Sequence, residues 1–201
     1  MALENEAKVE QRTKMVPVTK PKNWVILVLR LLAFAATASA TIVMALNKQT
    51  KTFVVATVGT TSINATLTAK FHHTPAFVFF VIANGMVSLH NLLMIAMSLF
   101  EGKLDFKGHR LALIAIFDML NTALVSAGVN AAVYMAELGK NGNKHARWDK
   151  ICDKFGTFCD HGGGAIIASF IGLGLMLVIS VISIVKLSKP KSDNVLIRLQ
   201  P

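Results

Sequence analysis

Two opposite charges stand inside long apolar stretches of this sequence. Arg30 lies in WVILVLRLLAFAATASATIVMAL, residues 24–46, and Asp118 lies in RLALIAIFDMLNTALVSAG. A guanidinium and a carboxylate can form a bidentate ion pair, which offsets the cost of removing either charge from water. Alternatively, the long side chain of Arg30 can extend to the lipid headgroups, which the shorter Asp118 cannot do. Asp118 therefore needs a partner, and we expect that partner to be Arg30.

Other polar side chains interrupt the same apolar stretches, namely Asn84, His90, Asn91, Asn121 and Asn130. With Arg30 and Asp118 they form either a proton or ion path, or a set of hydrogen bonds between helices worth ~0.6 kcal/mol per pair. Transporters generally carry broken helices or several acidic residues near the membrane midplane. Since this sequence offers one acid there, interhelical hydrogen bonding is the favoured interpretation.

No pattern typical of an enzyme accompanies these residues. The sequence has no His-Glu-x-x-His motif, no glycine-rich nucleotide loop, and no second intramembrane acid to form a dyad with Asp118. His72 and His73 have no cysteine or carboxylate neighbours at ligand spacing. We predict no catalytic residue, no metal site, no cofactor and no small-molecule substrate.

The elements that position these residues are long and apolar. The 201 residues are 53% hydrophobic and 16% charged, and their mean hydropathy is +0.54. About 20 apolar residues in a helix span the roughly 30 Å hydrocarbon core of a bilayer. Four segments qualify, at about 24–46, 76–99, 111–136 and 163–187. The sequence therefore predicts an all-α membrane protein, a four-helix transmembrane bundle over residues 24–187.

The segments outside the spans indicate how the chain is oriented. Twelve Lys and Arg residues fall in the tails (1–23 and 188–201, with Lys186) and the short loop 101–110, against eight in the outer loops 47–75 and 137–162. By the positive-inside rule both termini are cytoplasmic. The formal charge of +10 is spread over five segments, which favours attraction to anionic lipid over binding of nucleic acid.

Two features of the outer loops agree with this orientation. Asn64-Ala65-Thr66 is the one glycosylation sequon and lies in the first outer loop. Cys152 and Cys159, the chain's two cysteines, both lie in the second. We expect a structural disulfide between them, with two free thiols as the alternative.

The orientation also places the two charges. Arg30 lies seven residues past Asn23, roughly 10 Å into the membrane, and Asp118 lies eight residues past Arg110, roughly 12 Å in. Spans one and three run in the same direction, so the two residues lie at nearly the same depth. This equality of depth favours the ion pair.

Smaller features complete the expected architecture. The first outer loop, rich in Thr and Val around Gly59, is expected to form two short strands. Gly162-Gly163-Gly164 is expected to be a flexible entry to the fourth span. Small residues recur every four positions on three spans, which lets helices approach within a bundle or between copies: Gly164, Ala168 and Gly172; Ala123, Ala127 and Ala131; Ala36 and Ala40.

Three parts of the sequence resemble a known family. VLRLLAFAATASATIVMA with its Arg30, TPAFVFFVIANGMVSLHNLLMI, and the third-span Asp118 are similar to the Casparian strip membrane protein-like proteins of plants, which are related to four-span MARVEL-type proteins. The resemblance covers all four spans. The founding members carry a short Glu- and Phe-rich signature in the first outer loop, which residues 47–75 do not match, so the chain resembles the broader "-like" group.

The resemblance implies a plasma-membrane protein with cytoplasmic termini that forms homodimers and heterodimers. It also implies a membrane scaffold that guides local modification of the cell wall, and it assigns the family's intramembrane pair to Arg30 and Asp118. The alternative from a different class is a small ion or proton channel or transporter that uses Arg30, His90 and Asp118.

Overall fold

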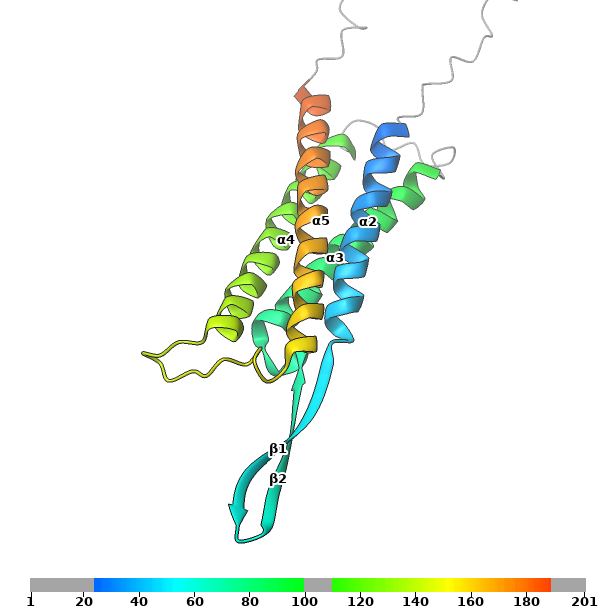
Figure 1. Cartoon of the computed structure of the whole chain (residues 1–201). Coiled ribbons are helices and arrows are strands. Elements are labelled where there is room, and N and C mark those ends of the chain that lie inside the picture. Colours follow the sequence, from blue (N-terminus) through cyan, green and yellow to red (C-terminus); the bar gives the residue numbers. More distant parts are fainter. Residues whose placement is uncertain (1–23, 100–109, 189–201) are drawn as a thin grey trace, which may run out of the picture.

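The computed structural model describes residues 24–99 and 110–188. Its elements in chain order are α2 (Trp24–Ala45), β1 (Lys48–Val58), β2 (Thr61–Lys70), the 3₁₀ turn η1 (Phe71–His73), α3 (Pro75–Leu99), α4 (Arg110–Asn141) and α5 (Gly156–Ser188) (Figure 1). The predicted tail 1–23, all but the first residue of the predicted tail 188–201, and most of the loop 101–110 lie outside the described residues.

The four α-helices form one bundle, and all four are long and apolar enough to cross a membrane. The prediction of a four-helix membrane protein is therefore confirmed. Each helix packs closely against two others, in the pairs α2–α3, α3–α4, α4–α5 and α2–α5. α2 and α4, which carry Arg30 and Asp118, consequently lie diagonally across the bundle.

The helices α4 and α5 are longer than the predicted spans 111–136 and 163–187. α4 continues to Asn141 and α5 begins at Gly156, so the second outer loop shrinks from 137–162 to 142–155. Hydropathy detects only the part of a helix in contact with lipid, whereas backbone hydrogen bonding continues into polar sequence beyond it. The expectation that Gly162-Gly163-Gly164 is a flexible entry was therefore wrong, because these glycines lie inside α5.

A β-hairpin projects from one end of the bundle (Figure 1). β1 and β2 pair antiparallel with a bulge between Val54 and Ala56, and Gly59 supplies a φ of +63° at the turn. Threonine hydroxyls contact each other across the strands, Thr50 with Thr68 at 3.0 Å. The all-α description therefore holds for the bundle, and the strands expected in the first outer loop are ten and eleven residues long.

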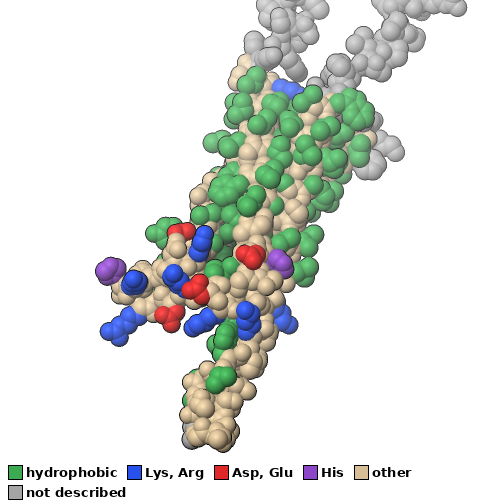
Figure 2. Space-filling model, viewed as in Figure 1, with side chains coloured by type: hydrophobic (Ala, Val, Ile, Leu, Met, Phe, Trp, Pro, Cys, Tyr) green, Lys and Arg blue, Asp and Glu red, His purple; other side chains and the backbone are tan. Residues whose placement is uncertain are grey.

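Two buried apolar clusters fill the bundle. The cluster nearer the hairpin contains Met44, Phe77, Phe80, Val129 and Ile166. The second contains Ala33, Val87, Val125, Met176 and Ile179. Outside, hydrophobic side chains cover the helices, and charged side chains gather at the hairpin end (Figure 2). We call the hydrophobic side chains around the helices the hydrophobic belt. Such a surface is expected of helices that face lipid.

Candidate functional site

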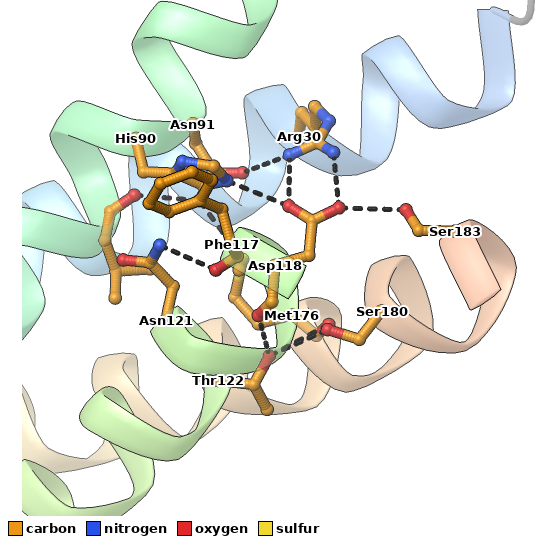
Figure 3. Close-up of polar contacts among 11 residues, drawn as sticks. Arg30, His90, Asn91, Phe117, Asp118, Asn121, Thr122, Met176, Ser180 and Ser183 are labelled. Atoms are coloured by element: carbon orange, nitrogen blue, oxygen red, sulfur yellow. Dashed lines mark hydrogen bonds and ion pairs between the residues drawn. The ribbon is translucent and has the colours of Figure 1, made fainter. Parts of the chain in front are cut away.

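Arg30 and Asp118 meet inside the bundle as a bidentate pair. Nη1 of Arg30 lies 3.0 Å from Oδ1 of Asp118, and Nη2 lies 2.7 Å from Oδ2 (Figure 3). Arg30 is 4% exposed and Asp118 is fully buried. Two parallel bonds of this kind between charged groups are stronger than neutral hydrogen bonds and fix the relative orientation of both side chains.

Two further donors complete the shell of Asp118. Nε2 of His90, on α3, lies 2.9 Å from Oδ1, and Oγ of Ser183, on α5, donates to Oδ2 at 2.8 Å. An ionised carboxylate only accepts hydrogen bonds, so Nε2 of His90 carries the hydrogen. Each carboxylate oxygen thus accepts two bonds, which fills the roughly four acceptor sites available to the group.

Asn91 supports the guanidinium from the side. Its Oδ1 lies 3.4 Å from Nη1 of Arg30, and its Nδ2 donates to the backbone oxygen of Val87 at 3.0 Å and contacts the sulfur of Met176 at 3.2 Å. Asn91 is fully buried. We name the group formed by Arg30, His90, Asn91, Asp118 and Ser183 the Asp118 cluster. It contains at least one side chain from each of the four bundle helices.

A hydroxyl pair adjoins the cluster. Oγ1 of Thr122, on α4, donates to the backbone oxygen of Asp118 at 2.7 Å and lies 2.9 Å from Oγ of Ser180 on α5. A separate contact lies nearer the hairpin, where Ser169 of α5 donates to Oδ1 of Asn84 on α3 at 2.8 Å. These bonds tie α5 to α4 and α3 along its length.

The structure does not bring all the predicted polar residues together. Arg30, Asp118, His90 and Asn91 share one cluster, and Asn84 is buried but belongs to the separate contact with Ser169. Asn121 is half-buried and donates within its own helix, to the oxygen of Phe117 at 2.8 Å. Asn130 is exposed on the outer face of α4. The expectation of hydrogen bonds between helices was therefore wrong within this chain for Asn121 and Asn130, because each side chain donates to the backbone of α4 itself.

Sequence reasoning missed the hydroxyls of α5. Ser169, Ser180 and Ser183 are all buried and all take part in interhelical bonds. Serine is common in membrane helices, so its presence alone predicts little. Their spacing could have identified two of them, because Ser180 and Ser183 are three residues apart and therefore share a helix face.

At the hairpin end, a disulfide and a pair of amides anchor the loops. Cys152 and Cys159 are bonded with their Cα atoms 5.6 Å apart. Nδ2 of Asn47 donates to the backbone oxygen of Phe158 at 2.7 Å, and Oε1 of Gln49 accepts from the amide of Phe158 at 2.9 Å. The start of β1 is thereby fixed to the first turn of α5. Asn64 is exposed on β2, where a glycan has room.

The chemistry open to the Asp118 cluster follows from its bonding. All acceptor positions of the carboxylate are occupied by side chains of the bundle, so the group is fixed in place and not presented to a ligand. Among the described residues, no group of three or more His, Cys, Asp or Glu is placed to hold a metal ion. The geometry is that of a structural clamp.

Comparison with known proteins gives the family. The model of the Casparian strip membrane protein domain matches residues 19–175. A CASP-like protein 1B1 of Populus trichocarpa is 68% identical over 196 residues, covering 96% of this chain and 100% of the relative. A CASP-like protein 1B1 of Arabidopsis thaliana is 67% identical over 166 residues, covering 83% and 84%, respectively. No solved structure matches the chain. With the domain matched over most of the bundle and relatives of similar length, the chain belongs to the Casparian strip membrane protein family.

Proposed function

We propose that this chain is a non-enzymatic scaffold of the plasma membrane, whose copies assemble with each other and with related four-span proteins in the plane of the bilayer. Both termini lie in the cytoplasm, and the hairpin and the disulfide loop face the cell wall. The assembled domain marks a site at which the wall is locally modified. The name of the family and the names of the relatives support a membrane role of this kind.

The interior of the bundle supports a static role. Among the described residues, the buried polar side chains of the bundle bond to side chains or backbone oxygens within it, and one buried side-chain atom, Oδ1 of Asn47, has no hydrogen-bond partner. A conduction path needs groups that can exchange partners with a passing ion or proton. A clamp needs the opposite, which is what Asp118 and its four bonds provide.

The observation that carries the proposal of assembly is an amide on the outer face of α4. Asn130 is exposed, and its Nδ2 donates to the backbone oxygen of Ser126 on its own helix. It lies beside a row of small residues that also face outward or are half-buried: Ala123, Ala127 and Ala131. Small residues permit close approach of a second helix, and an amide in an apolar environment gains from a hydrogen bond across that interface.

Photo-cross-linking in native membranes tests this interface. A photoreactive amino acid at Ala127 is expected to yield covalent dimers, whereas the same probe at exposed Ala35 of α2 should yield far fewer. Asn130→Leu should lower the dimer yield about threefold, since such a bond is worth ~0.6 kcal/mol. Ser39→Leu is the matched control, because Ser39 is likewise exposed and bonded to its own helix, but it lies on α2 and not on α4. Equal yields from both probe positions would contradict the α4 interface.

A flux measurement distinguishes the scaffold from the alternative, a small channel or transporter. The protein reconstituted in liposomes is expected to pass protons and monovalent ions no faster than empty liposomes. A flux that requires the protein and disappears in Asp118→Asn would favour the alternative and would contradict the static role of the cluster.

A further inference from the structure

A cavity of about 650 Å³ opens between the hairpin-side ends of α4 and α5. Its size lies within the range of about 300–1,000 Å³ typical of sites for small molecules. The walls are largely apolar and include Phe77, Val133, Phe158, Ile166 and Ile167. None of the lining residues belongs to the Asp118 cluster, so the cavity is a separate feature of the bundle.

Three glycines keep this space open. Gly156, Gly163 and Gly164 line the cavity, and a Cβ built on any of them would meet no other heavy atom within 4 Å. Glycine within a helix is unfavourable by roughly 0.5–1 kcal/mol relative to alanine. Gly163 and Gly164 lie inside α5, where that cost applies, and their missing side chains are what hollows the helix surface.

The cavity crosses the boundary between apolar and polar surface. Ile167, one of the apolar residues that line the cavity, is 63% exposed and belongs to the hydrophobic surface that faces lipid. The lining also includes three exposed charged residues, Glu137, Lys140 and Asp160. Figure 2 shows charged side chains gathered at this end of the bundle, beyond the hydrophobic belt. An apolar wall continued by a charged rim matches a molecule with an apolar body and a charged head.

We propose that this cavity binds one zwitterionic phospholipid from the surrounding leaflet. Lys140 meets the phosphate, the carboxylates of Glu137 and Asp160 meet the ammonium group, and the apolar wall around Ile167 contacts the start of an acyl chain. The rim carries one cation and two anions, so an anionic headgroup would meet net repulsion. A sterol, with a single hydroxyl, would leave the charges of the rim unmatched. The proposed lipid site does not depend on assembly, so it can be tested independently of the proposed scaffold function.

Native mass spectrometry of the full-length chain tests the proposal. The protein is purified in detergent containing equal amounts of phosphatidylethanolamine, phosphatidylglycerol and sitosterol, and the lipid retained on the monomer is identified. We expect one retained phosphatidylethanolamine. Gly164→Leu should lower its retention about tenfold or more, because each displaced methylene changes affinity about fourfold.

Gly174→Leu is the matched control for this substitution. Gly174 lies on the same helix and also has no heavy atom within 4 Å of an added Cβ, but it does not line the cavity. Retention should be unchanged in that variant. A peptide map showing the Cys152–Cys159 bond verifies the local fold of each variant.

Reversing the charge of the acidic residues at the rim gives a second, independent test of the lipid site. Glu137→Lys combined with Asp160→Lys should shift retention from phosphatidylethanolamine to phosphatidylglycerol. Wild-type preference for phosphatidylglycerol or sitosterol would overturn the proposal. So would undiminished retention in Gly164→Leu, or a lipid preference that the double lysine variant leaves unchanged.

Discussion

At the scale of single residues, Asp118 determines how the four helices are held together at one end of the bundle. Its carboxylate accepts bonds from Arg30 on α2, His90 on α3 and Ser183 on α5. Because α2 and α4 lie diagonally, the bidentate pair crosses the bundle and is not a contact between neighbours. Removing either charge leaves the other buried without its partner, whereas removing both leaves neither Arg30 nor Asp118 as an unpaired charge.

This asymmetry gives the first prediction. Arg30→Leu and Asp118→Leu should each lower the free energy of unfolding by ~3–5 kcal/mol, the scale for breaking a buried ion pair. The double variant should be more stable than either single variant, because no uncompensated charge remains. Unfolding of the purified protein by SDS titration measures the difference. Asn121→Leu, one turn along α4, is the control and should change stability by less than about 0.5 kcal/mol.

A different result would show that Arg30 does not stabilise the bundle by pairing with Asp118. If Arg30→Leu is tolerated and the double variant is no better than Asp118→Leu, then Arg30 extends to the headgroups and the pair contributes nothing. A charge swap is a weaker test, because an arginine at position 118 would face the donors His90 and Ser183, which are arranged for a carboxylate.

At the scale of elements, the close approach of helices depends on glycine at particular positions. A Cβ on Gly172 of α5 would lie 2.7 Å from Cγ2 of Thr37 on α2, and a Cβ on Gly128 of α4 would lie 2.8 Å from Cβ of Ala83 on α3. Real Cβ atoms do not make contacts this short, so with a side chain at either position the facing residue or the helix that carries it must shift.

Gly172 and Gly174 make a matched pair for the second prediction. Gly172→Ala should lower the free energy of unfolding by about 1–3 kcal/mol, because it overpacks the α2–α5 contact. Gly174→Ala meets no atom within 4 Å and should leave stability equal or slightly higher, because alanine favours the helix. Unfolding of both variants by SDS titration provides the comparison, and equal destabilisation would show that the contact is looser than described.

The disulfide supports the third prediction. Cys152 and Cys159 bond within one chain, across the start of α5. Replacing both by serine should reduce the free energy of unfolding by ~2.5 kcal/mol in the chain-entropy account of an eight-residue loop. Non-reducing and reducing peptide maps should differ in this peptide alone. Covalent dimers on non-reducing gels would instead assign the cysteines to assembly.

The sequence predicts some of these elements and leaves others undetermined, for physical reasons. Four apolar stretches of spanning length predict four helices, and two lone charges at equal depth predict their own pairing. The direction in which a side chain faces around a helix was not predictable, because these helices are apolar on all sides and lack the polar face that orients a helix in water. Asn130 was therefore expected to bond between the helices of the bundle although it is exposed on α4, and Ser183 was missed.

At the scale of the whole molecule, the features expected outside the cell lie at one end. The hairpin with Asn64 and the loop with Cys152 extend from the same end of the bundle, and Trp24 and Ser188 lie at the other (Figure 1). An even number of spans requires this arrangement of the ends, whichever side of the membrane each faces.

The fourth prediction concerns that side. If the hairpin end faces the lumen during synthesis, Asn64 is glycosylated, and enzymatic removal of the glycan should increase gel mobility in the wild type but not in Asn64→Gln. Labelling of single cysteines introduced at 103–108 should require a permeable membrane. Labelling of those positions from outside intact cells would reverse the orientation.

The central claim is that the chain is a stationary part of an assembled membrane domain. Recovery of fluorescence after photobleaching of a tagged protein in the plasma membrane tests it most directly, with Asn130→Leu as the variant that weakens the proposed contact between copies. The account predicts that most of the wild-type fluorescence fails to recover over minutes and that Asn130→Leu recovers faster. Complete recovery of the wild type, at the rate of a freely diffusing four-span protein, would contradict it.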